Sequence, residues 1–374
     1  MKVTRRRFLQ ASAAALAAPR MAFGQALYPV ERIAPMLVVG FDGASSEAFG
    51  AKRMAEHIAA NRVGGICFIY KNAVTRPGVE SLTSLFHDAS SQWPLLMAID
   101  QEGGQVQRLS SHLGYGDEPS AVRVATELDA GMARQTYSDM AKAMRMTGFN
   151  VNLAPVVDLG FEQRNAIITR LGRSYGAEPG TVIKYSRAFV NGHRDNGVLT
   201  ALKHFPGHGS ALRDSHEGAV DVTRTWRDSE LAPYASLARE GSIDMVMIGH
   251  ISHLTLTGGL PASLSSDAIG GILRKRVGYS GVVISDDLDM AAVRKSNSLE
   301  EAAIKAAAAG NDILLFTNKD SDVDLPVPLI AAIQQGIRDG RLKAEQIEAS
   351  VARIEAMKQG LARMALMPKG PREL

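Results

Sequence analysis

The chain has 374 residues with 42 basic and 39 acidic side chains, which gives a formal net charge of +3. Five of the basic residues and none of the acidic ones fall within residues 1–24, so the rest of the chain carries 37 basic against 39 acidic residues. Such a balance gives no sign of a basic surface for nucleic acid or anionic lipid, and we expect neither partner. The single cysteine, Cys67, excludes an internal disulfide.

The first 24 residues have the order of features found in an export signal. Arg5, Arg6 and Arg7 stand directly before Phe-Leu, an alanine-rich apolar run follows over residues 11–18, and small residues follow at 22–24. We therefore predict a twin-arginine export signal in residues 1–24, a mature domain over residues 25–374, and a periplasmic location. The apolar run is too short to remain as a membrane anchor.

The start site bears on that location. Translation from Met21 or Met36 would remove the signal and leave the protein in the cytoplasm.

Short apolar, β-branched runs alternate with helix-like segments through the chain. The predicted strands cover residues 36–40, 64–70, 95–100, 149–154, 199–204, 243–248, 281–286 and 312–317. Helices are predicted between them, for instance over residues 125–147, 177–195 and 299–309, and a last amphipathic helix over residues 343–363. Eight strands alternating with helices, without a linker, indicate a single α/β domain with the (β/α)₈ barrel fold. A doubly wound open sheet is the alternative.

Residues 203–216 read K-H-F-P-G-H-G-S-A-L-R-D-S-H and concentrate groups that can transfer a proton. These groups are His204, His208, Asp214 and His216. Proline cannot donate to a sheet and glycine permits conformations closed to other residues, so the strand should end near His204 and lead into a shaped loop. Three histidines could also hold a metal, but their spacing is wide for one loop and no cysteine is nearby. We predict no metal and no organic cofactor.

Ionisable residues recur at the C-terminal ends of the predicted strands, where the chemistry of such barrels is located. Asp100, Lys203, His204, His250 and Asp286 stand at strand ends, while Arg108 and Arg173 lie in the loops that follow. Each has an ordinary alternative: Asp100 as a helix cap, Arg173 as a surface residue, His250 as a core histidine. Because neighbouring strand residues point to opposite faces, only one of Asp286 and Asp287 can face the barrel axis.

Five motifs together resemble the β-N-acetylglucosaminidases of glycoside hydrolase family 3. They are D-Q-E-G-G-Q-V-Q-R from residue 100, N-L-A-P-V-V-D from residue 152, G-R-S-Y-G from residue 172, K-H-F-P-G-H-G with D-S-H from residue 203, and S-D-D-L-D-M from residue 285. The resemblance covers nearly the whole of residues 25–374, in order. It implies a single (β/α)₈ barrel, without the second domain of many β-glucosidases of the family.

The resemblance also implies residue roles in a retaining double displacement. Asp286 matches the family nucleophile, and His216 paired with Asp214 matches an unusual histidine acid/base. A carboxylate that accepts one imidazole N–H fixes the tautomer and favours the protonated ring. The sugar contacts implied by the family are Asp100, Arg108, Arg173, Lys203 and His204, and His250 is added as a substrate-binding candidate from its strand-end position.

The expected activity is removal of terminal β-linked N-acetylglucosamine from peptidoglycan-derived muropeptides or chito-oligosaccharides, by a monomer. A phosphorylase remains open, because a histidine repels a phosphate acceptor less than a carboxylate does. A β-glucosidase or xylosidase would share Asp286, but the Asp214/His216 pair argues against it. A non-catalytic exported sugar-binding barrel is the alternative outside the enzymes.

Overall fold

The computed structural model describes residues 27–90, 94–213 and 218–366, so the predicted export signal lies outside the described part. Eight parallel strands form its central sheet, in the spatial order β11-β9-β7-β6-β3-β2-β1-β12. Their bounds are β1 Leu37–Gly40, β2 Gly65–Phe68, β3 Leu96–Ile99, β6 Val151–Asn152, β7 Leu199–Phe205, β9 Met245–Ile248, β11 Val282–Ser285 and β12 Leu314–Phe316. Seven of the eight predicted strands contain one of them, and β7 extends one residue beyond its predicted end at residue 204.

The sheet closes on itself between its two terminal strands. Ile284 of β11 and Ile313, just before β12, form a parallel bridge, and the Ser285 backbone N–H donates to the Ile313 carbonyl at 2.9 Å. An open sheet would leave these backbone groups unpaired at two edges. The (β/α)₈ barrel is confirmed, and the doubly wound alternative is wrong.

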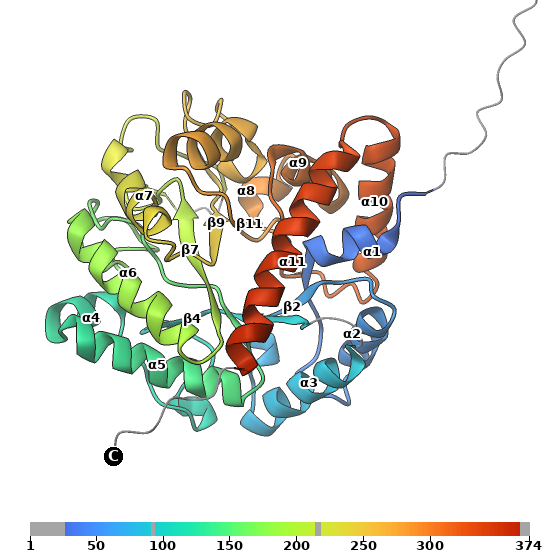
Figure 1. Cartoon of the computed structure of the whole chain (residues 1–374), viewed down its shortest axis with the longest axis horizontal. Coiled ribbons are helices and arrows are strands. Elements are labelled where there is room, and N and C mark those ends of the chain that lie inside the picture. The colour runs from blue at the N-terminus through green and yellow to red at the C-terminus, as the bar shows by residue number, and fades with distance from the viewer. Residues whose placement is uncertain (1–26, 91–93, 214–217, 367–374) are drawn as a thin grey trace, which may run out of the picture.

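Helices lie around the outside of the strands (Figure 1). The longer ones are α2 Phe49–Ala59, α3 Arg76–Ala89, α4 Ala121–Glu127, α5 Ala130–Met146, α6 Pro179–Arg194, α7 Ala232–Arg239, α9 Leu299–Ala309 and α10 Pro326–Arg338. Shorter helical segments are α1 Val30–Ile33, η1 Ala34–Met36, η2 Tyr70–Asn72, η3 Ser111–Leu113, η4 Asp228–Leu231, η5 Ala262–Leu264 and α8 Ala291–Arg294, and η6 Asp267–Val277 is a π-helix. Side-chain caps at Thr75, Asp129 and Ser298 begin α3, α5 and α9.

The strands are buried on both faces, as parallel strands between a barrel interior and a helical layer must be. Edge-to-face aromatic pairs link Phe41, Phe68 and Phe86, and Phe149 packs on Phe68 with ring centroids 4.9 Å apart. The rings join β2 to helix α3, so the apolar sequence runs that predict strands also provide the contacts that hold the helices in place.

The last helix, α11 Ala344–Leu366, crosses the molecule beside α1 (Figure 1). Its predicted apolar stripe is confirmed, because Ile347, Val351 and Ile354 are almost fully buried. Lys358 of this helix donates to the carbonyl of Gly64, directly before β2, at 3.0 Å. Helix α11 therefore covers N-terminal ends of barrel strands, away from the predicted site.

The structure differs from the sequence prediction in detail. The helix predicted over residues 125–147 is two helices, because the Asp129 side chain accepts the Met132 N–H and begins α5 there. Two small sheets flank the barrel: β4 Gln101–Gly103 with β5 Val106–Gln107, and β8 Val220–Asp221 with β10 Ile251–Ser252. Within the described residues, no helix is long and apolar enough to cross a membrane.

Candidate active site

A cavity of about 490 Å³ opens at the C-terminal ends of the barrel strands. Its walls bring together side chains from β2, β7, β9 and β12 and from the loops that follow β2, β3, β6, β7, β11 and β12. The polar or ionisable lining residues are Tyr70, Asp100, Glu102, Arg108, Arg173, Lys203, His204, His208, Asp286, Asp287, Thr317 and Lys319. Six of the nine predicted site residues therefore line one cavity.

Lys203 holds two carboxylates at the centre of this cavity. Its ammonium lies 2.8 Å from Asp100 Oδ1 and 2.7 Å from Glu102 Oε1, and only 3% of its side chain is exposed. Asp100 and Glu102 are two positions apart on an extended segment, so their side chains point the same way. Lys203 reaches them from β7. The buried ion cluster therefore connects the end of β3 to the end of β7.

Two arginines complete this ion cluster. Arg173 donates to both oxygens of Glu102 at 2.7 Å and to the carbonyl of Ile167 at 2.8 Å. Arg108 donates to Asp100 at 3.0 Å and stacks over the ring of Tyr70 with its guanidinium carbon 3.6 Å from the centroid. The Nε and Nη1 atoms of Arg108 have no partner among the described residues, so these buried donors can serve a ligand hydroxyl.

The cluster fixes the charge state of its members. Burial favours a raised pKa for Asp100, but Lys203 and Arg108 outweigh it and hold the pKa below its usual value. In Glu102 burial is likewise outweighed by Arg173 and Lys203, and the pKa is strongly lowered. The pKa of Lys203 is raised, because its two carboxylates outweigh burial. At neutral pH both carboxylates are ionised and the lysine is protonated.

His204 is oriented by a buried carboxylate that the sequence prediction had left without a role. Its Nδ1–H donates to Asp158 Oδ2 at 2.7 Å, which leaves Nε2 as the ring nitrogen available to a ligand. Asp158 also accepts the backbone N–H of His208 at 2.7 Å. Burial lowers the pKa of His208 to about 4, so this second histidine is neutral. Asp158 thus organises the first turn of the loop after β7.

Glu230, in η4 just before α7, also holds the loop that follows β7. Glu230 accepts hydrogen bonds from the Ser210 backbone N–H at 3.1 Å and from the Ser210 hydroxyl. Burial raises the pKa of Glu230 to about 8. The Trp226 indole N–H donates to the carbonyl of Pro206 at 3.1 Å. The segment that precedes Asp214 in the sequence is therefore anchored up to Ser210.

Asp286 and Asp287 have different surroundings at the end of β11. Asp287 accepts from the Thr317 N–H at 2.9 Å, the Thr317 hydroxyl at 2.7 Å and the Asp289 N–H at 3.0 Å. Its carboxylate therefore ties the loop after β11 to the end of β12. Asp286 lies on the cavity wall, half-buried, and its Oδ1 accepts the Asp287 N–H at 2.8 Å.

The remaining predicted residues fall elsewhere. Asp214 and His216 lie outside the described residues. His250 is buried and is not part of the cavity wall: its Nε2–H donates to the Asp287 carbonyl and its Nδ1 accepts from the Ser263 hydroxyl, both at 2.8 Å. With both ring nitrogens engaged, His250 supports the backbone beside Asp286, and the prediction of a direct sugar contact does not fit this geometry.

Glu102 and Asp158 are the cavity-organising residues that sequence reasoning missed. Both stand in motifs used above, D-Q-E-G-G and N-L-A-P-V-V-D. The spacing of two between Asp100 and Glu102 was a usable signal, because it predicts one common face on an extended chain. Asp158 offered no such signal, since its partner His204 is 46 residues away in the sequence.

Comparison with known proteins agrees with this fold. The family model of the glycosyl hydrolase family 3 N-terminal domain matches residues 30–357. The beta-hexosaminidase LpqI of Mycobacterium tuberculosis is 35% identical over 351 residues, which is 89% of this chain and 83% of that protein. A beta-hexosaminidase of Xylella fastidiosa is 35% identical over 294 residues, 76% of this chain and 84% of that protein.

A solved structure is also similar. The family 3 beta-N-acetylglucosaminidase of Paenibacillus sp. aligns with a TM-score of 0.80 and 31% identity, over 93% of this chain and 66% of that longer one. A family match over most of the chain, with two beta-hexosaminidases 35% identical over 83% and 84% of their own length, establishes the class. The chain belongs to glycosyl hydrolase family 3 and is a glycoside hydrolase.

Proposed function

We propose that the protein is a retaining exo-β-N-acetylglucosaminidase that removes terminal β-linked N-acetylglucosamine. The observation that carries the proposal is the position of Asp286, a carboxylate on the wall of a cavity whose other polar groups are held by buried ion pairs. Similarity to proteins named beta-hexosaminidase supports the choice of sugar. The volume of about 490 Å³ fits one sugar unit with room for part of a leaving group.

Sugar binding in this proposal uses preorganised hydrogen-bonding groups. Asp100 and Arg108 together offer an acceptor and free N–H donors on one side of the cavity, and from β7 Lys203 offers an N–H donor and His204 presents its Nε2. Because the ion cluster holds these side chains in place before the sugar arrives, little conformational entropy is lost on binding. Arg173 acts through Glu102, which it grips with two hydrogen bonds.

The proposed reaction begins with attack of an Asp286 oxygen on the anomeric carbon. The bond from that carbon to the leaving oxygen breaks as the glycosyl ester forms, and the leaving oxygen takes a proton from the His216 imidazolium. Water then gives a proton to the neutral His216 and its oxygen to the anomeric carbon, which releases Asp286. Asp214 would orient the imidazole through one N–H.

We expect hydrolysis of an aryl N-acetyl-β-glucosaminide and little turnover of the matching aryl β-glucoside. The N-acetyl group is the only difference between these substrates, so the ratio of their kcat/KM values measures recognition of that group alone. Release of the phenol is followed by absorbance. Equal rates would assign the protein to the glucosidases of the family, and a sugar 1-phosphate product in phosphate buffer would assign it to the phosphorylases.

Asp286→Ala should lower kcat by at least ~10³-fold, because it removes the atom that forms the covalent intermediate. Added azide should restore part of the turnover of an activated aryl substrate, with an α-glycosyl azide as the product identified by mass spectrometry. Asp287→Asn is the matched variant: it weakens the link to Thr317 and should lower the melting temperature without azide rescue. Rescue of Asp287→Asn alone would reverse the assignment.

His216→Ala should slow substrates with poor leaving groups far more than activated aryl substrates, since only poor leaving groups need a proton to depart. Asp214→Ala should show the same bias at smaller size, because the imidazole remains. The two losses should not add in the double variant, as expected for residues acting as one unit. Kinetics on a natural disaccharide and a nitrophenyl glycoside measure both effects, and equal losses on the two substrates would contradict an acid/base role.

The proposed substrates are peptidoglycan-derived fragments, and the proposed location is the periplasm. The ordered basic, apolar and small residues of positions 1–24 support export. Fractionation with N-terminal sequencing should recover a periplasmic protein that begins near Gln25. A cytoplasmic protein that still begins at Met1 would contradict export while leaving the proposed chemistry untouched.

A further inference from the structure

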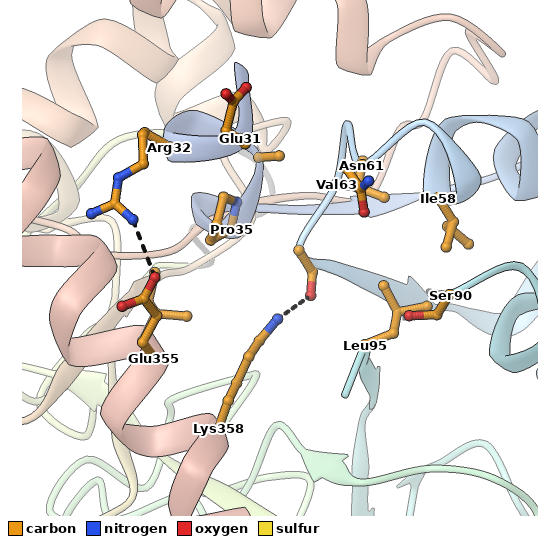
Figure 2. Close-up of a pocket in the computed structure, with 13 residues that line it drawn as sticks. Glu31, Arg32, Pro35, Ile58, Asn61, Val63, Ser90, Leu95, Glu355 and Lys358 are labelled. Carbon is orange, nitrogen blue, oxygen red and sulfur yellow. Dashed lines mark hydrogen bonds and ion pairs between the residues drawn. The ribbon is translucent and has the colours of Figure 1, made fainter. Parts of the chain in front are cut away.

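A second cavity, of about 240 Å³, lies at the end of the barrel where the strands begin, and Figure 2 shows the residues that line it. Its walls come from residues that precede strands, namely Pro35 before β1, Gly64 before β2 and Leu95 before β3, and from helix α11. Nothing in the proposed reaction uses this end. The cavity therefore has to be explained by its own side chains.

Lys358 of α11 places a buried ammonium on the wall of this cavity. The residue is 6% exposed, and its Nζ donates to the Gly64 carbonyl at 3.0 Å, as the dashed line in Figure 2 shows. An ammonium has three N–H donors, and no second acceptor for Lys358 is found in the described residues. Nor does any carboxylate in the described part of the chain lie within ion-pair distance of it.

Burial disfavours this charge. Desolvation lowers the pKa of Lys358 from its ordinary 10.5 to about 8, so the group is still mostly protonated at neutral pH. A buried cation usually has a counter-charge, because desolvation without one costs free energy. At the other end of the barrel Lys203 has two carboxylates, whereas Lys358 has a single carbonyl.

The other charged groups of the cavity do not supply the missing anion. Glu355 is 3.2 Å from Arg32, and Figure 2 shows its carboxylate turned toward that guanidinium and away from Lys358. Arg32 also binds Glu348. Glu31 is exposed and points away from the interior in the same view. Pro35, Ile58, Val63, Leu95 and Ile354 provide the aliphatic part of the walls, and Asn61, Ser90 and the Arg32–Glu355 ion pair provide the polar part.

We propose that this cavity binds a small monocarboxylate with a short apolar body, whose carboxylate accepts hydrogen bonds from Lys358. A cation with unused donors matches the carboxylate, and the aliphatic walls match the body. Glu31 and Glu355 also line the cavity and Arg32 offsets only part of their charge, so a singly charged ligand is repelled less than a dianion such as phosphate. The ligand sits at the end of the barrel away from Asp286 and is not the glycoside substrate.

Titration calorimetry of the full chain with hexanoate tests the proposal, with hexanamide as the uncharged match and inorganic phosphate as the dianion. Hexanoate should bind saturably, and hexanamide and phosphate roughly tenfold more weakly or not at all, because a charge-assisted hydrogen bond is worth about a factor of ten or more. Lys358→Met should abolish the preference for hexanoate. Lys343→Met, at an exposed lysine just before the same helix, should bind as the unmodified protein does.

The Lys358→Met variant should fold and keep its glycosidase activity, because methionine fills the volume of the lysine stem without a buried charge. Unchanged hexanoate binding in this variant would overturn the proposal, as would the absence of saturable binding to the unmodified protein. Equal binding of hexanoate and hexanamide would reduce the cavity to an apolar pocket with no anion site. None of these results depends on which glycoside the enzyme hydrolyses.

A pH measurement gives a second readout. Since the folded pKa of Lys358 lies below its ordinary value, the unfolded chain holds more protons between about pH 8 and 10.5, and this group makes the free energy of unfolding rise with pH in that window. Bound carboxylate should keep the amine protonated, so hexanoate binding near pH 8 should take up protons and weaken as pH rises. Calorimetry in two buffers of different ionisation enthalpy measures the uptake. No uptake, or uptake retained in Lys358→Met, would contradict the assigned contact.

Discussion

The buried ion cluster around Lys203 is the interaction on which the catalytic end of the barrel depends. Five charged side chains from three separate segments meet there: Asp100 and Glu102 after β3, Arg108, Arg173 and Lys203. Removal of one partner from such a buried cluster costs roughly 3–5 kcal/mol, because it leaves another charge uncompensated. The cluster is therefore both a structural joint and a rigid binding surface. The same contacts that keep the segments together fix where each polar atom faces the cavity.

The charge of this cluster also suits a carboxylate nucleophile. Three cations stand against two carboxylates, so the cluster carries one excess positive charge on a cavity wall that also carries Asp286. In the proposed reaction a negatively charged carboxylate attacks, and positive charge on the same wall is electrostatically complementary to it. The backbone beside Asp286 is braced separately, by Asp287 to Thr317 and by His250 to the Asp287 carbonyl. Different sets of residues thus set the charge near Asp286, the proposed nucleophile, and the position of its backbone.

The barrel could be predicted from the sequence because its strands are buried on both faces and most of them are short apolar runs, such as Leu96–Ile99 and Met245–Ile248. The occurrence of ionisable residues at strand ends then correctly predicted that one site contains Asp100, Lys203, His204 and Asp286. The same reasoning predicted His250 as a sugar contact, but His250 does not line the cavity. A position at a strand end does not determine the orientation of the ring, which here is set by Ser263 and a backbone carbonyl. The role of Asp158 could not be predicted either, because its partner His204 is 46 residues away and such a pairing leaves no local sequence pattern.

Buried charges have different partners at the two ends of the barrel. At the C-terminal end every ion-cluster lysine and arginine has a carboxylate, and the pKa of Lys203 is raised by its partners. At the N-terminal end Lys358 is buried with a carbonyl as its one acceptor among the described residues, and burial lowers its pKa. Loss of one partner from a paired buried charge leaves the other charge uncompensated, whereas a buried ammonium without a carboxylate is already uncompensated and gains from any anion that enters. The paired charges around Lys203 suit a rigid active site. The ammonium of Lys358 suits a cavity where stability would depend on whether an anion is bound.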